Sequence, residues 1–278
     1  MKVRCVMRLL MTAAVVLFSS LSLFAAVDPN STEEVPSVKT IINKANLVAY
    51  YQGNDGKAKV RMTITNKKGQ KRKREFIILR KDVKDVNDGG DQNYFVYFQK
   101  PADVRKMVFM VHKHADPNKD DDRWLYLPAL SLVKRIAAGD KRTSFVGSDF
   151  LYEDISGRSL EEDTHELIET TDKLFVLKNV PKKPGTVKFG YYNVSIDRKT
   201  YVPMKMEYYD KDNKLYRIIE SKKIEKIQNF PTVVKSVVRN LKTGGKTVME
   251  FSDIKYNIKL KDIFEERYLH RPPREATR

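Results

Sequence analysis

The sequence predicts a mainly β protein in which one amphipathic helix precedes an antiparallel meander of strands. Near residue 57 the spacing of apolar residues changes from a helical period to strict alternation. Short alternating runs then follow one another to residue 258, and turn-forming residues separate most of them. Two of the longer runs change phase partway, which predicts bulges that bend the sheet. Long, bent antiparallel strands favour a half-open barrel.

Residues 1–26 have the pattern of a secretory signal peptide. Three basic residues lie within the first eight positions, and residues 9–26 carry no charge. An uncleaved membrane anchor is the alternative, but serine and threonine within the apolar run favour cleavage after Ala26. Cleavage would remove Cys5, the one cysteine of the chain, and with it any disulfide or thiol chemistry. We therefore expect a periplasmic protein in which residues 27–36 form a flexible lead-in.

An amphipathic helix of about four turns is expected after the lead-in. Its start is marked by Ser37, a residue type that caps helices, and its end is expected near Gly53. The apolar residues at i, i+3 and i+4 spacing are Val38, Ile41, Ile42, Ala45 and Val48. Because no Gly/Pro/Ser-rich linker divides the rest of the chain, we expect one domain over residues 37–270 and a loose tail over 271–278.

The strands are predicted from alternating apolar and polar residues. In the first strand, Ala58, Val60, Met62 and Ile64 alternate with polar neighbours, and Lys67-Lys68-Gly69-Gln70 forms the turn that follows. The expected strands cover residues 57–65, 72–80, 93–99, 106–112, 123–127, 132–137, 173–179, 186–196, 201–209, 214–220, 231–240 and 246–258. This rhythm is typical of an all-β meander and differs from that of strands alternating with crossover helices.

Two predicted strands change face along their length. Between residues 246 and 258, Met249 and Phe251 share one phase, whereas Ile254 and Tyr256 share the other. Between residues 186 and 196, an odd-numbered apolar series gives way to an even-numbered one at Tyr192. Each phase change predicts a bulge.

The formal net charge is +17, from 53 basic and 36 acidic residues. In an exported protein this balance points to anionic lipid headgroups, acidic envelope polymers or an acidic protein partner, and nucleic acid is not expected. The densest basic cluster, proposed as a basic rim that meets an anionic membrane surface, consists of Lys67, Lys68, Lys71, Arg72, Lys73 and Arg74. The alternative is a charged hairpin tip that prevents the sheet edge from pairing with other chains.

Three short patterns resemble catalytic or metal sites without meeting their requirements. His112 and His114 would share one face of a strand, but no carboxylate or third histidine stands at a convincing spacing. Residues 116–122 lack the glycine and the terminal glutamate of a calcium loop. Ser148 lacks the G-x-S-x-G context of a serine hydrolase, and nothing places a histidine beside it. We therefore expect no metal, no cofactor and no catalytic residue.

Large apolar residues on the predicted inner face suggest a lipid-binding cavity. Several are methionines, whose flexible side chains accommodate ligands of variable shape. A fully packed core is the alternative for any one of these residues. Burial of a 16-carbon acyl chain would contribute a gross driving force of about 12 kcal/mol. The predicted lining residues are Met62, Ile64, Phe95, Tyr97, Val108, Met110, Trp124, Tyr126, Met204, Met206, Tyr208, Met249 and Phe251.

The central segment, residues 122–158, contains the most specific motif of the chain. It reads W-L-Y-L-P-A-L-S-L-V-K-R-I from Trp124 and S-F-V-G-S-D-F-L-Y-E-D from Ser144. These runs resemble the signature of outer-membrane lipoprotein-sorting proteins, relatives of the periplasmic lipoprotein carrier LolA. Lys134 replaces the first of two arginines in that signature. Residues 201–210, 239–242 and 248–253 extend the resemblance along most of the chain.

The resemblance implies a half-open antiparallel barrel around an apolar groove, with short lid helices across its mouth. It implies a lid or mouth that contains Phe145, Ser148, Asp149, Phe150 and Tyr152. It also implies a periplasmic carrier without enzymatic activity. Such a carrier binds the acyl chains of a lipid or lipoprotein and hands them on across the envelope in outer-membrane biogenesis, with an inner-membrane exporter as a partner. The alternative is a non-enzymatic adaptor that docks a protein complex through its basic face.

Overall fold

The computed structural model describes residues 34–83 and 89–277. The chain divides into two units, Met1–Val35 and Pro36–Arg278, and the second contains the fold. The predicted signal peptide and most of the predicted lead-in lie outside the described residues. Within the described ranges, no helix has both the length and the apolar character needed to cross a membrane.

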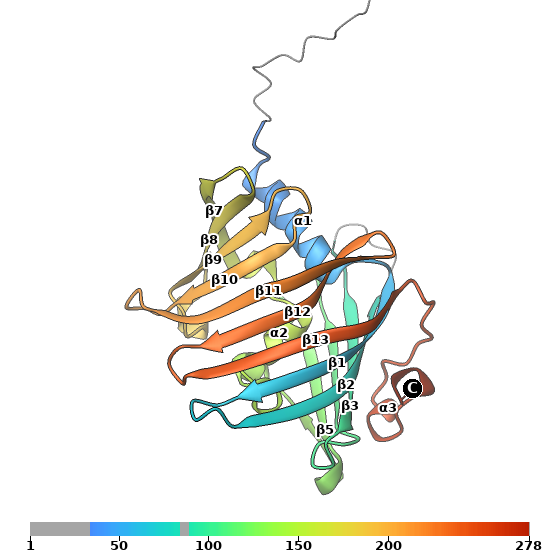
Figure 1. Cartoon of the computed structure of the whole chain (residues 1–278). Coiled ribbons are helices and arrows are strands. Elements are labelled where there is room, and N and C mark those ends of the chain that lie inside the picture. Colours follow the sequence, from blue (N-terminus) through green and yellow to red (C-terminus); the bar gives the residue numbers. More distant parts are fainter. Residues whose placement is uncertain (1–33, 84–88, 278) are drawn as a thin grey trace, which may run out of the picture. The chain divides into compact units, whose positions relative to one another are not determined.

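One antiparallel sheet of 13 strands forms the framework of this unit (Figure 1). The order of the strands is β6-β5-β4-β3-β2-β1-β13-β12-β11-β10-β9-β8-β7. Because β6 and β7 are the two edges and do not pair with each other, the barrel is half-open, as predicted from the sequence. The strands are β1 (Asp55–Thr65), β2 (Lys71–Asp82), β3 (Gln92–Lys100), β4 (Val108–Lys113), β5 (Asp122–Leu127), β6 (Leu132–Arg135), β7 (Asp163–Thr170), β8 (Leu174–Pro181), β9 (Tyr191–Asp197), β10 (Pro203–Tyr209), β11 (Leu215–Ile227), β12 (Phe230–Asn240) and β13 (Gly245–Tyr256).

Helix α1 (Val38–Tyr50) begins at the residue that the sequence predicts. The Ser37 hydroxyl oxygen accepts a hydrogen bond from the Thr40 backbone N–H at 3.2 Å, which satisfies one of the free donors at the helix start. The helix ends at Tyr50, slightly before the predicted Gly53. The shorter helices are η1 (Pro128–Leu130), η2 (Ala138–Arg142), η3 (Phe145–Gly147), α2 (Tyr152–Ser156), η4 (Leu160–Glu162), η5 (Pro184–Thr186), α3 (Arg267–His270) and α4 (Arg274–Thr277).

A predicted bulge lies where β13 pairs with β1. Lys57 is opposite Lys255, whereas Lys59 is opposite Ser252, so β13 contains one extra residue at this point. The second predicted bulge is wrong, because β9 begins only at Tyr191. The segment before it is a loop held against Asp210 at Gly190, where a Cβ atom would stand 3.0 Å from the Asp210 carbonyl oxygen.

Sequence periodicity missed one strand and half of another. β7 is an edge strand with few buried side chains, so it has no apolar series to reveal it. The second half of β11, residues 221–227, is charged and mostly exposed, yet it pairs with β12 as far as Phe230. In both cases backbone hydrogen bonds to a neighbouring strand determine the structure, and single-sequence periodicity does not record them.

Three apolar clusters bury the two faces of the sheet. The central cluster surrounds Phe145 on the inner face, and the helix cluster joins α1 to β8, β9 and β10. The C-terminal cluster lies on the outer face of β2–β5, where the segment that contains α3 covers it (Figure 1). The predicted loose tail contains α4, whose Ala276 is buried in the C-terminal cluster. Lys57 fixes this tail further by donating a hydrogen bond to the Glu275 carbonyl oxygen at 2.7 Å.

Phe145→Ala is expected to lower the free energy of unfolding by about 3–5 kcal/mol, because it leaves a large cavity in a core. The Phe145 ring is fully buried, 5.5–6.1 Å from the ring centres of Phe76, Phe109 and Tyr152. Urea unfolding measures the change, with Phe230→Ala at a half-buried ring as the control. A loss below about 1 kcal/mol would show that this segment is not anchored in the core.

Candidate ligand cavity

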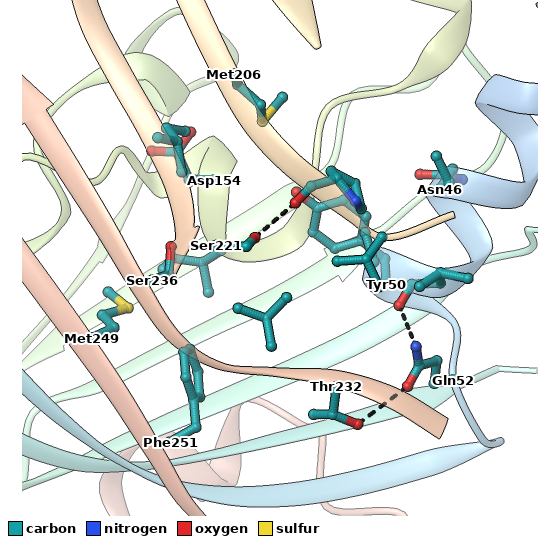
Figure 2. Close-up of a pocket in the computed structure, with 18 of the residues that line it drawn as sticks. Asn46, Tyr50, Gln52, Asp154, Met206, Ser221, Thr232, Ser236, Met249 and Phe251 are labelled. Atoms are coloured by element: carbon teal, nitrogen blue, oxygen red, sulfur yellow. Dashed lines mark hydrogen bonds between the residues drawn. The ribbon is translucent and has the colours of Figure 1, made fainter. Parts of the chain in front are cut away.

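A cavity of about 390 Å³ lies between the inner face of the sheet, helix α1 and the segment around α2 (Figure 2). Its size is within the range of small-molecule binding sites. One wall is apolar residues of α1, and the opposite wall is formed by strands from both halves of the sheet. The apolar lining residues include Ile42, Ala45, Val48, Ala49, Phe76, Ile78, Phe150, Ile155, Leu160, Val194, Val202, Met206, Ile219, Val233, Met249, Phe251 and Ile254.

Three polar side chains at the α1 end of the cavity, Gln52, Arg80 and Thr232, are bonded to neighbouring side chains or to the backbone. The Gln52 amide donates to the Val48 and Pro231 carbonyl oxygens at 2.8 and 2.7 Å. The Thr232 hydroxyl lies 3.0 Å from the Tyr256 hydroxyl. Arg80 donates to the Tyr50 and Gln52 carbonyl oxygens at 2.8 and 2.9 Å. Since these groups are already satisfied within the protein, a ligand would be held here mainly by apolar contact.

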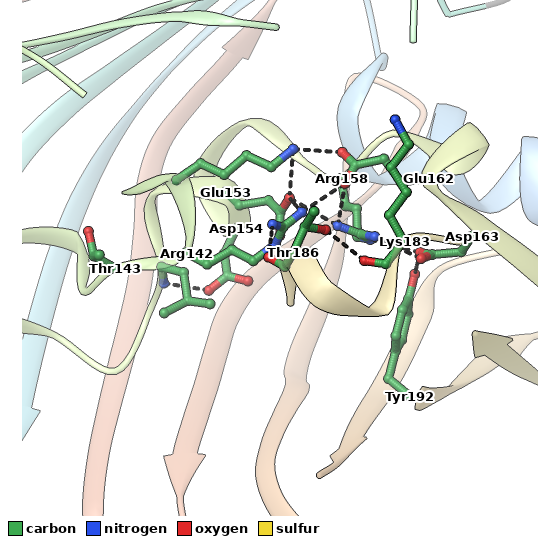
Figure 3. Close-up of polar contacts among 12 residues, drawn as sticks. Arg142, Thr143, Glu153, Asp154, Arg158, Glu162, Asp163, Lys183, Thr186 and Tyr192 are labelled. Atoms are coloured by element: carbon green, nitrogen blue, oxygen red, sulfur yellow. Dashed lines mark hydrogen bonds and ion pairs between the residues drawn. The ribbon is translucent and has the colours of Figure 1, made fainter. Parts of the chain in front are cut away.

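A buried network of ion pairs holds the α2 segment beside the cavity (Figure 3). Glu153 accepts hydrogen bonds from Arg142 at 3.1 Å and from Arg158 at 3.3 Å. Arg158 also pairs with Glu162 at 2.6 Å and with Asp163 at 2.8 Å. Burial opposes the charge of Glu162, but hydrogen bonding to Lys141 and the nearby arginines outweigh it and lower the pKa of Glu162. The network therefore consists of charged side chains that are paired with opposite charges inside the network.

A second ion pair ties α2 to the sheet. Asp154 lines the cavity and forms a short contact with the buried Arg217 of β11. Burial raises the pKa of the Asp154 carboxyl, although Arg217 acts in the opposite direction. Arg217 also donates to the Asp149 carbonyl oxygen at 3.2 Å, and the Asp149 carboxylate accepts from the Thr247 hydroxyl of β13 at 2.7 Å. The segment is therefore attached to two strands that line the cavity.

Lys113 of β4 links the ends of both helices that cover the cavity. Its amine donates to the Ser156 carbonyl oxygen at the end of α2, at 2.9 Å. It also lies over the rings of Tyr50 and Tyr51, 5.3 and 5.6 Å from their centres. Burial lowers the pKa of Lys113 from 10.5 to about 8, although Asp121 opposes the shift.

With this geometry, comparison with known proteins identifies the family. A family model described as "-like: Uncharacterized protein" matches residues 90–271. A solved DUF1329 family protein from Desulfovibrio piger is 29% identical, with a TM-score of 0.75, over 84% of this chain and 100% of that chain. A putative outer membrane lipoprotein-sorting protein domain from Vibrio parahaemolyticus is 26% identical, with a TM-score of 0.73, over 84% of this chain and 97% of that one. The chain belongs to the family that this model describes, and it is similar in sequence and fold to these two solved proteins.

A LolA superfamily protein from Nitrosomonas europaea shares the fold, with a TM-score of 0.64 and 17% identity over 84% of this chain and 100% of that chain. No curated protein matches the sequence.

In this LolA-like chain, four of the predicted lining residues do contribute to the cavity wall: Met206, Tyr208, Met249 and Phe251. Met62 and Ile64 are buried in the adjacent central cluster instead. Met204 is half-buried on β10 and does not line the cavity.

The other six predicted lining residues lie on the opposite face of the sheet, which corrects their assignment. They are part of the C-terminal cluster or pack against it: Phe95, Tyr97, Val108, Met110, Trp124 and Tyr126. The reason is that β3 and β4 are buried on both faces, so nearly every position is apolar. Alternation alone cannot tell the inner face of such a strand from the outer one.

The residues expected at the lid or mouth lie together in one segment, but only Phe150 lines the cavity. Phe145 and Tyr152 are buried in the central cluster, and Asp149 bonds to β13. Ser148 is buried, and its hydroxyl bonds to the backbone of Phe150. The α1 residues that line the cavity are not among the residues predicted from the sequence to line it, although their amphipathic spacing is visible there.

The residues expected to form a basic rim lie away from the cavity. Residues 56–58 at the start of β1 line the cavity, whereas the basic turn follows the far end of the same strand. Lys67, Lys68, Lys71 and Lys73 are exposed there, and Arg72 donates to the Gly147 carbonyl oxygen at 3.2 Å. Arg74 is buried and pairs with Asp103 at 3.3 Å, so it is not part of an exposed rim.

The two strand histidines have separate structural roles. His112 bonds to the Phe264 carbonyl oxygen at 2.6 Å, and His114 lies 3.3 Å from both Asp91 and Asp122. No cluster of metal-binding residues is present in the described part of the chain.

The Lys113→Met variant tests the buried amine at the helix ends. In the folded state Lys113 loses its proton near pH 8, whereas the unfolded chain keeps it until about pH 10.4. The unfolding free energy of the parent protein should therefore rise relative to that of Lys113→Met as the pH increases from about 7 to about 9.5. Urea unfolding at several pH values measures this difference, with Lys119→Met as an exposed control. A difference that does not change with pH would contradict a lowered pKa of Lys113 in the folded protein.

Proposed function

We propose that this protein is a periplasmic carrier that binds an acyl chain of a lipid or lipoprotein in the cavity between α1 and the sheet. The observation that carries the proposal is a mainly apolar cavity of about 390 Å³, in which polar neighbours such as Gln52 and Thr232 are bonded within the protein. An acyl chain has no hydrogen-bonding groups, so it gives up no hydrogen bonds to water when it enters such a site. Each buried methylene contributes about 0.8 kcal/mol, which makes the chain the main source of affinity.

The walls of the cavity suit a ligand of variable shape. Met206 and Met249 line it from two well-separated strands, and both side chains are flexible and polarizable (Figure 2). Helix α1 forms a wall without being a strand of the sheet, so its displacement would open the cavity while the sheet stays intact. We propose that the carrier receives and hands on its ligand in this way, with a membrane exporter as one partner and without covalent chemistry.

A Ser236→Trp substitution tests the carrier proposal. Ser236 lines the cavity from β12, so an indole there would occupy space that the acyl chain needs. Using the chain that begins at Val27, we expect Ser236→Trp to weaken the binding of a fluorescent 16-carbon fatty acid at least about tenfold, equal to about 1.4 kcal/mol. Fluorescence titration measures the dissociation constant.

The matched control is Ser252→Trp, because Ser252 is exposed on the adjacent strand β13 and does not line the cavity. This variant should bind the fatty acid as the parent protein does. Thermal unfolding verifies that both variants are folded. Equal affinity of the two tryptophan variants, or no binding by the parent protein, would refute the carrier proposal and favour the adaptor alternative.

A further inference from the structure

One end of the sheet collects exposed cations and exposed leucines. The pairing register places the β1–β2, β3–β4, β5–β6 and β12–β13 turns at the same end of their strands. We call this the hairpin end. The β4–β5 and β9–β10 turns lie at the opposite end.

The β5–β6 turn exposes two large apolar side chains. Leu130 is 69% exposed and Leu132 is 48% exposed, although both stand in a short and well-defined hairpin. The base of this hairpin is fixed, because Leu127 packs against the central cluster and Val133 packs against the C-terminal cluster. The two leucines are thus held out from the body of the protein on a supported turn. Single exposed leucines are ordinary, but a pair on one tip beside cations is a feature of interaction sites.

The next two turns along the sheet, on one side of this tip, carry positive charge. Six exposed side chains on the β1–β2 and β3–β4 hairpins have no ion-pair partner among the described residues: Lys67, Lys68, Lys71, Lys73, Arg105 and Lys106. Acidic residues dominate the β4–β5 turn at the opposite end, where Asp116, Asp120 and Asp121 outnumber Lys119. The exposed cations of these two hairpins would attract an anionic surface.

We propose that the hairpin end docks on an anionic phospholipid bilayer, with Leu130 and Leu132 entering the interface and the lysines contacting the headgroups. A bilayer matches both parts of the surface, since it offers an apolar layer directly beneath a sheet of negative charge. The proposal names the surface at which the carrier meets its ligand, and it rests on the proposed carrier function for that role. The cavity and the docking surface are separate, so each can be removed without the other.

Vesicle flotation tests this surface with the chain that begins at Val27, which keeps the whole unit from Pro36 onward. Vesicles of equal parts phosphatidylcholine and phosphatidylglycerol are compared with vesicles of phosphatidylcholine alone. We expect binding to the anionic vesicles only, and we expect it to fall steeply as the salt concentration rises from about 0.1 M to about 0.5 M. Each lysine near the surface contributes about a fivefold factor to the partition coefficient.

Two variants remove the two parts of the surface. The combined Lys67→Ser, Lys68→Ser and Lys71→Ser variant and the combined Leu130→Ser and Leu132→Ser variant should each lower the partition coefficient at least about tenfold. Two control variants make similar changes elsewhere. Lys119→Ser with Lys199→Ser removes exposed lysines at the opposite end, and Ile168→Ser removes an exposed apolar residue on β7. The controls should bind as the parent does.

Several outcomes would overturn the proposal. They are no binding to anionic vesicles, equal binding to both kinds of vesicle, or the same loss in the control variants as in the two test variants. Fatty-acid titration of the same proteins separates this proposal from the carrier function. Normal fatty-acid binding with no vesicle binding would refute only the docking surface, and the reverse result would refute only the carrier function.

Discussion

The fold depends on how an open 13-stranded sheet buries its inner face. A barrel closed on itself would fill its interior with its own side chains, but here β6 and β7 do not meet, and another part of the chain must supply the cover. Helix α1 and the segment around α2 provide it. Phe145 fills the centre of the inner face, while the space toward α1 stays open as the apolar cavity. The partial filling of one concave face thus creates both the core and the site.

Buried charges fix the cover in place. The α2 segment is attached through Asp154 to Arg217 of β11, through Asp149 to Thr247 of β13, and through Glu153 to a network of cations. Buried ion pairs add little net stability compared with apolar packing, but their geometry is specific. Their effect here is to hold a short and irregular segment in one position. Helix α1 packs on the sheet mainly through apolar side chains, and we propose it as the wall that moves. A carrier needs this combination of one fixed wall and one movable wall.

The sequence predicted the parts of this structure that depend on local patterns. The cap at Ser37, most of the strands, the half-open barrel and the bulge in β13 follow from residue type and periodicity. Alternation also identifies Met249 as a residue of the inner face, because near that residue just one face of β13 is apolar. It could not assign Phe95 or Trp124 to a face, since both faces of β3 and β4 are buried and the C-terminal segment that covers the outer face is distant in sequence. The contribution of α1 to the cavity could not be predicted either, because it also depends on contacts between residues that are far apart in the chain.

The most direct test of the account is to identify what occupies the cavity. The chain that begins at Val27 is purified, extracted with organic solvent, and the extract is analysed by mass spectrometry, both as isolated and after incubation with lipid vesicles. The account predicts a phospholipid, fatty acid or acylated peptide in about equimolar amount to the protein. An extract free of acylated molecules under both conditions would contradict the carrier function.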